Sequence, residues 1–133
     1  MANYAGGDKF IVEKKQVTAA ANLVDKTLVC ANGAVPANGA NTAWGVLERD
    51  TANGDYATLK RGTVAIIATG TVTEGGYVEV LLSTFTTKDT TGVSGAGVQD
   101  VSSTDYIVGR AVTGGSVNDT VLIDLYDKAS KNG

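Results

Sequence analysis

From Thr27 onward, short runs of β-branched and aromatic residues alternate with glycine, asparagine and aspartate. This alternation is typical of consecutive strands joined by tight turns. The predicted strands are Thr27 to Ala31, Ala43 to Glu48, Tyr56 to Lys60, Thr63 to Ala68, Tyr77 to Leu82, Tyr106 to Val112 and Thr120 to Tyr126. Their spacing predicts an all-β fold, a small β-barrel or sandwich of about seven to nine short strands with an extended N-terminal arm.

Turn-forming dipeptides separate several of these runs. They are Asn32-Gly33, Asn53-Gly54, Gly75-Gly76 and Gly114-Gly115. Because glycine and asparagine tolerate positive φ, these dipeptides favour hairpin connections. In the last run, Val121 to Tyr126, apolar residues occupy both alternating sets. Such a pattern fits a strand with one face in a barrel and the other against a partner subunit.

The two ends of the chain differ in character from the middle. We expect an N-terminal arm over residues 1–20, a β-barrel domain over 21–127 and a flexible C-terminal tail over 128–133. The first sixteen residues are polar, and their few apolar groups cannot offset the entropy of ordering them alone. They are therefore predicted to order on a partner. The best helical candidate, Val12 to Leu23, has a short and uncapped apolar stripe.

A second irregular stretch runs from Ser83 to Thr104. It is rich in threonine, serine and glycine. Two structures fit this composition, a strand near Phe85 or a long exposed loop.

Composition and charge narrow the list of partners. A hydrophobic content of 43% and a net charge of −3 are typical of a globular protein rather than a disordered one. Lys14-Lys15 and Lys60-Arg61 are the only adjacent cations, so we expect no nucleic acid partner. No apolar run approaches the ~18 residues of a membrane helix, and the N-terminus lacks a secretion signal. We therefore expect no membrane partner and synthesis in a cytoplasm.

Residues that carry common enzyme chemistry are scarce. The chain has no histidine and one cysteine, Cys30. Without histidine there is no Ser-His or Cys-His pair and no ordinary zinc set. The run Asp50-Thr-Ala-Asn-Gly-Asp55 resembles a calcium loop, but its spacing differs and no glutamate closes it, so a hairpin turn explains it better. We expect no catalytic residues, no metal, no cofactor and no enzymatic activity.

Trp44, the sole tryptophan, admits two interpretations. Tryptophan is over-represented among interface hot spots, so Trp44 is a candidate binding anchor. The other interpretation is a large half-buried residue that fills one end of a barrel, and this structural role is the favoured one.

The order of the strand and turn motifs resembles that of small head decoration proteins, also called capsid cement proteins, of tailed phages. The matching motifs are Leu23-Val-Asp-Lys-Thr-Leu-Val29, Ala43-Trp-Gly-Val46, Asn53-Gly-Asp55, Lys60-Arg-Gly-Thr-Val64, Val72-Thr-Glu-Gly-Gly-Tyr-Val-Glu-Val80, Tyr106-Ile-Val-Gly-Arg-Ala-Val112 and Val121-Leu-Ile-Asp-Leu125. Together they lie between Leu23 and Leu125.

This resemblance implies a protein that binds the outer surface of an assembled head and stabilises contacts between major capsid subunits. It implies a virion protein made in the host cytoplasm, with the major capsid protein as partner and a homo-oligomer, most simply a trimer. The candidate contact residues on this hypothesis are the apolar anchors Tyr4 and Phe10, the cations Lys9, Lys14 and Lys15, and Trp44. The alternative is a phage surface module that binds a host receptor or a carbohydrate, with aromatic rings stacked on sugars.

Overall fold

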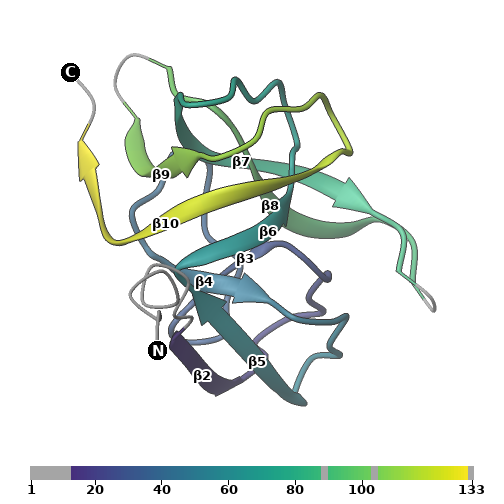
Figure 1. The fold of residues 1–133 in the computed structure, drawn as a ribbon. Coiled ribbons are helices and arrows are strands. Elements are labelled where there is room, and N and C mark those ends of the chain that lie inside the picture. The colour runs from purple at the N-terminus through teal and green to yellow at the C-terminus, as the bar shows by residue number, and fades with distance from the viewer. Residues whose placement is uncertain (1–12, 88–89, 103–104, 132–133) are drawn as a thin grey trace, which may run out of the picture.

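A computed structural model describes residues 13–87, 90–102 and 105–131 of the chain (Figure 1). The strands are β2 (Glu13–Thr18), β3 (Leu28–Cys30), β4 (Ala43–Leu47), β5 (Tyr56–Arg61), β6 (Thr63–Ile67), β7 (Tyr77–Phe85), β8 (Val93–Asp100), β9 (Tyr106–Ala111) and β10 (Thr120–Lys131). They form one nine-stranded sheet in the order β2-β5-β4-β3-β8-β7-β9-β10-β6. The predicted all-β class is confirmed. Within these described ranges, no helix is long and apolar enough to cross a membrane.

All seven predicted strands are present, and β8 is an additional one inside the irregular stretch. β7 continues to Phe85 and pairs with β8 from Val78↔Asp100 to Phe85↔Val93. The glycines of β8 lower its strand propensity, so the sequence did not predict this strand, but they permit close packing. A Cβ atom on Gly95 would lie 2.7 Å from the Phe85 ring, and one on Gly97 would lie 2.6 Å from the Ile67 carbonyl oxygen.

The structure also differs from the expected arm and tail. Residues 13–18, expected in the arm and near the start of the helical candidate, form β2 and pair with β5 from Glu13↔Arg61 to Thr18↔Tyr56. The physical reason is Val17, whose burial against the neighbouring strand anchors an otherwise polar segment. At the other end, the backbone of residues 128–131 continues β10 and pairs with β9, for example at Ser130↔Ile107. Residues 1–12, 132 and 133 lie outside the described residues.

The predicted turns join neighbours in only some cases. Asn53-Gly54 connects β4 to β5, and Gly54 has a φ of 91°, which favours glycine. Gly114-Gly115 lies between β9 and β10, which also pair. Gly75-Gly76, however, lies between β6 and β7, which are not neighbours in the sheet. The chain therefore crosses over at that point instead of forming a hairpin.

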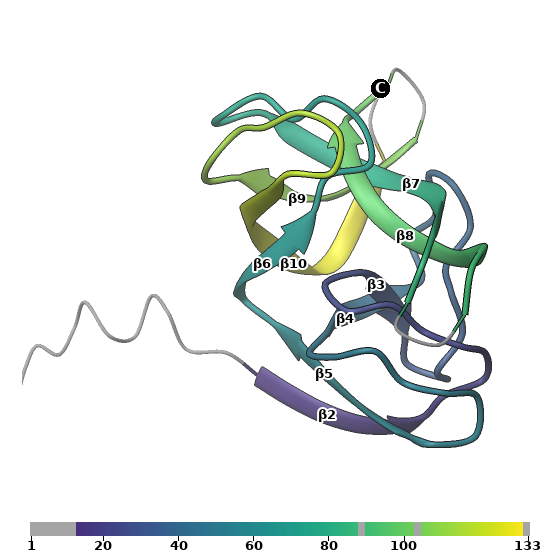
Figure 2. The same cartoon turned by 90° about the vertical axis from the view of Figure 1, so that its right-hand side faces the viewer.

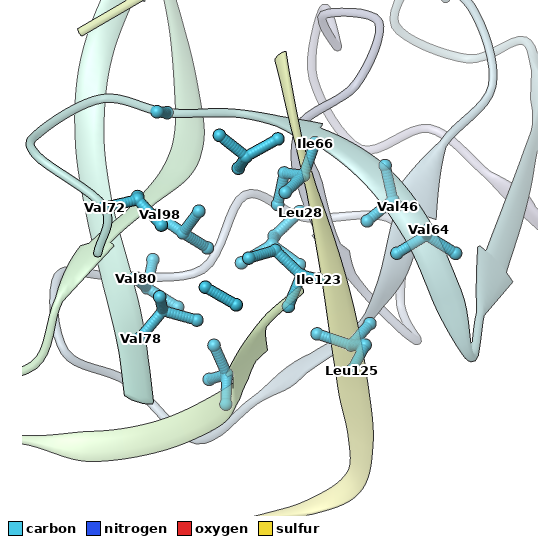
Figure 3. Packing of buried hydrophobic residues seen from close by; sticks show 14 of the residues in the cluster. Leu28, Val46, Val64, Ile66, Val72, Val78, Val80, Val98, Ile123 and Leu125 are labelled. Atoms are coloured by element: carbon cyan, nitrogen blue, oxygen red, sulfur yellow. The ribbon is translucent and has the colours of Figure 1, made fainter. Parts of the chain in front are cut away.

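Two hydrophobic cores share the middle of the sheet. The first core contains Leu28, Val46, Val64, Ile66, Ala68, Val72, Val78, Val80, Ala96, Val98, Val108, Ala111, Val121, Ile123 and Leu125 (Figure 3). The second core contains Val17, Ala19, Leu23, Val29, Leu47, Ala57 and Leu59. Because successive residues of a strand point to opposite faces, β3 and β4 supply both cores, Leu28 and Val46 to the first, Val29 and Leu47 to the second.

The sheet curls around the first core. Beyond the end of β6, Ala68 forms an isolated parallel bridge with Val98 of β8, and the Thr69 amide donates to the Val98 carbonyl at 3.0 Å. The Ile67 amide donates to the Lys26 carbonyl at 2.9 Å. The Ile67 end of the β6 edge is thus covered, giving a barrel-like enclosure. β2 stands at the opposite end of the sheet, below this enclosure in Figure 2.

Candidate functional site

Three of the six predicted contact residues lie close together in the structure. Lys14 and Lys15 are consecutive in β2, and Trp44 is in β4, with β5 between these two strands. Tyr4, Lys9 and Phe10 lie outside the described residues. The site therefore consists of β2, β5 and the start of β4, with Lys15 on the same face as Trp44 and Lys14 on the opposite face.

Two cations lie over the ring of Trp44. The guanidinium carbon of Arg61 lies 4.0 Å from the ring centroid, and the Lys15 ammonium lies 5.6 Å from it. Arg61 also donates from Nε to the Trp44 carbonyl oxygen at 3.2 Å. Such cation–π contacts hold the ring and the cation in a fixed relation. Trp44 is half-buried and packs against the second core, so its position favours the structural role.

A second cluster of charges spans β2, β5 and the residue that follows β4. Lys14 is directly opposite Lys60 in the β2–β5 register. Like charges in this position repel each other. Glu48 relieves part of the repulsion, because its Oε1 lies 3.0 Å from the Lys14 ammonium. Two cations thus share one nearby carboxylate.

These neighbouring cations affect the pKa of Glu48. The hydrogen bond from Lys14 holds the pKa of the Glu48 carboxyl below its ordinary value of 4.5. The positive charge of Lys60 acts in the same direction. The Lys14 side chain keeps 60% of its surface exposed, so it remains accessible to a partner.

Sequence reasoning missed Lys60, Arg61 and Glu48 as members of this site. The adjacent pair Lys60-Arg61 was visible, but its position opposite β2 depends on strand register. A count of charged residues along the chain indicates part of this site. Residues 13–61 contain six Lys or Arg and five Asp or Glu, whereas residues 62–125 contain two and seven. Cations are therefore concentrated in the half of the chain that builds β2 to β5.

The run from Asp50 to Asp55 borders a polar cavity of about 280 Å³. Hydrogen bonds tie this run to the segment from Asn22 to Asp25: Asp50 Oδ1 accepts from the Asp25 amide at 2.8 Å, and Asn22 Oδ1 accepts from the Asn53 amide at 3.0 Å. In the part of the chain that the structure describes, no group of three or more Cys, Asp or Glu side chains is placed to hold a metal ion.

An exposed apolar strip lies on the outer surface of the first core. Leu122 of β10 is 41% exposed, whereas Val121 and Ile123 on either side are buried. Val112, beside it at the end of β9, is 48% exposed, and its amide donates to the Leu122 carbonyl at 2.8 Å. Among the described outward-facing residues of β10, Leu122 is thus an exposed apolar side chain between Thr120 and Asp124.

Comparison with known proteins identifies a structural relative. No protein-family model matches the chain, and no curated protein matches it. Among solved structures, the fold is similar to the crystal structure of the head fiber gp8.5 N base in bacteriophage phi29. The TM-score is 0.59 at 15% sequence identity, over 90% of this chain and 98% of that chain. At this identity the similarity establishes a shared fold.

Proposed function

We propose that this chain is a phage capsid decoration protein that binds the outer surface of the assembled head and stabilises contacts between major capsid subunits. One observation carries the proposal: nearly the whole chain shares its fold with the base of a phage head fiber. The order of the strand and turn motifs supports the same function from the sequence. On this proposal the protein belongs to the virion, is made in the host cytoplasm and needs no catalytic group or cofactor.

The mechanism is physical rather than chemical. A closed oligomer that contacts several shell subunits makes every contact after the first intramolecular, which raises avidity by ~10²–10⁴. Each contact can then be modest. The exposed strip of Leu122 and Val112 supplies an apolar surface for a second copy, and a trimer is the simplest arrangement. The cations of β2 supply polar contacts to the shell.

Co-sedimentation with heads tests the proposal. Purified protein would be mixed with expanded and unexpanded heads built from the cognate major capsid protein, and bound copies would be counted per shell subunit. Saturable binding at a simple ratio, stronger on expanded heads, is expected. Absence of binding to either form would overturn the proposal.

A truncation assigns the contribution of the N-terminal residues. Residues 13–15 belong to β2, so the deletion must stop before them. Deletion of 2–12 is the appropriate test, because it leaves the β2–β5 pairing intact. The truncated protein should fold and bind heads more weakly, since Tyr4, Lys9 and Phe10 are removed. Unchanged binding would exclude these residues as contacts.

A host-receptor or carbohydrate-binding module is the second candidate. Tyr56 is 74% exposed and follows Asp55, which lines the polar cavity. An exposed aromatic ring suits the apolar face of a ligand such as a sugar, and the carboxylate and amide groups that line the cavity suit its hydroxyl groups. Trp44 suits this role less, because Arg61 covers its ring. Specific binding on a glycan array, together with no binding to heads, would favour this candidate.

A further inference from the structure

We infer that the outer edge of β2 binds an extended, acidic segment of a major capsid subunit, which adds to the sheet as a further strand. This inference rests on the proposed function and specifies its contact. Extended segments commonly bind at unpaired sheet edges, where main-chain hydrogen bonds give affinity and flanking side chains give specificity.

The register determines which backbone groups point outward from β2. The Ala19 amide donates to the Asp55 carbonyl at 2.8 Å, next to the pair Thr18↔Tyr56. In an antiparallel ladder the residues alternate between pairs that exchange hydrogen bonds and pairs that do not. Lys14 and Gln16 therefore direct their N–H and C=O groups away from β5. The Thr18 carbonyl also points away from β5, but the turn at Gly33 lies in close contact with it and covers this end of the edge. The open part of the edge is centred on Lys14 and Gln16.

The two ends of the sheet differ in charge. β6 (Thr63–Ile67) has no charged side chain, and on its side away from β10 the Ile67 amide donates to the Lys26 carbonyl at 2.9 Å. Among the described residues, β2 pairs with β5 alone, and it carries Lys14 and Lys15. An acidic incoming strand thus finds matching charges beside the open positions of β2 and finds none on β6.

Charge identifies the occupant of this edge. Lys14 and Lys15 are exposed on β2, and Lys60 lies opposite Lys14. Glu48 lies near Lys14, and Glu13 lies 3.8 Å from Arg61, but these two carboxylates stand against four cations, Lys14, Lys15, Lys60 and Arg61. Two copies of β2 placed edge to edge would bring their lysines together, which is repulsive. An acidic strand would instead supply the carboxylates that this cluster lacks, so the occupant is a different, acidic chain.

Substitution of Gln16 tests the backbone part of the inference. Gln16→Pro removes an outward N–H that β2 does not use for pairing with β5, and proline is tolerated at such positions of edge strands. Gln16→Ala is the matched control, because it removes the same side chain and keeps the N–H. In co-sedimentation with heads, Gln16→Pro is expected to weaken binding at least about tenfold, while Gln16→Ala changes it less than about twofold. Unfolding temperatures check that both variants fold.

Charge reversal tests the partner's chemistry and remains informative if Gln16→Pro fails to fold. Lys14→Glu is expected to weaken head binding at least about tenfold and to reduce its salt dependence. Lys26→Glu makes the same charge change on an exposed lysine outside β2 and β5, and should leave binding within about twofold.

The outcomes separate this inference from the proposed function. If the unmodified protein does not bind heads, both are wrong. If it binds and Gln16→Pro binds as well as Gln16→Ala, the proposed function stands and strand addition is overturned. If Lys14→Glu self-associates but binds heads normally, the lysines only protect the edge from pairing with other copies, and the acidic occupant is overturned.

Discussion

The region around the first core and the region around the second core differ in closure and charge. Strands β6 to β10 curl around the first core, and the Ile67 end of the β6 edge is covered. Strands β2 to β5 enclose the smaller second core and, in the part of the chain that the structure describes, end at an open edge at β2. Residues 62–125 are strongly acidic, whereas residues 13–61 carry slightly more cations than anions. If the inferred acidic segment binds at β2, the roles are divided: one region mainly stabilises the fold and the other carries the contact.

The two regions are nevertheless joined by shared strands. β3 and β4 place Leu28 and Val46 in the first core and Val29 and Leu47 in the second. Neither region can lose these strands without exposing the other core. We therefore expect one cooperative unit. In it, strands β6 to β10, the closed region, hold the contact surface of β2 and β5 rigidly.

The largest expected effect tests this cooperativity. Ile123→Ala creates a cavity in the first core, and Leu59→Ala creates one in the second; both side chains are fully buried. Each should lower the free energy of unfolding by about 2–5 kcal/mol. Urea unfolding followed by far-UV and near-UV signals should show a single transition for both variants. Two separate transitions, or one region left unaffected, would show that the cores unfold independently.

The next effect concerns the closure around the first core. A Cβ atom on Gly97 would lie 2.5 Å from the Thr69 methyl carbon and 2.6 Å from the Ile67 carbonyl oxygen. Gly97→Ala should therefore destabilise the protein by about 1–3 kcal/mol through overpacking. Ser94→Ala, at an exposed position of the same strand, is the control and should stay within about 0.5 kcal/mol. Equal stability of both variants in urea unfolding would mean that β8 and β6 do not pack closely.

A buried carboxylate in the closed region gives a third test. Glu79 is 2% exposed; it accepts hydrogen bonds from Gln99 Nε2 at 2.6 Å and from the Ser102 amide at 2.9 Å. Glu79→Ala leaves both donors without this partner and should cost about 1–3 kcal/mol. Glu74→Ala, at an exposed position, should have little effect on the urea midpoint. If Glu79→Ala leaves the free energy of unfolding unchanged, this network does not hold the loop after β8.

The smallest effect lies in the contact region and depends on pH. The folded pKa of Glu48 is lowered by Lys14, so the ion pair stabilises the fold at neutral pH and this contribution is lost as pH falls through the folded pKa. Glu48→Gln should lower stability by less than about 1 kcal/mol at neutral pH. Thermal unfolding from about pH 7 to about pH 3 should show the difference from the unmodified protein shrinking. A difference that grows on acidification would contradict this assignment.

Most of the fold follows from local sequence patterns. The seven predicted strands are rich in β-branched and apolar residues, and all seven are present. β8 was not predicted because Gly95 and Gly97 lower strand propensity, although close packing requires them. β2 was not predicted because its exposed polar residues hide the single buried Val17.

The site was less predictable because it is assembled across strands. Lys14, Lys15 and Trp44 were identified from residue type, and the structure brings them to one end of the sheet, with Lys15 beside Trp44 and Lys14 on the opposite face. The positions of Lys60 opposite Lys14 and of Arg61 over Trp44 depend on register between distant segments. Periodicity within one strand carries no information on that register, so the cation cluster required the structure.

Electron cryomicroscopy of heads with and without the bound protein tests the central claim most directly. The account predicts additional density on the outer surface of the shell, with the β2 edge against a major capsid subunit and the closed region around the first core farther from the shell. Heads without added density, or density in which the β2 edge faces solvent while another surface contacts the shell, would contradict it.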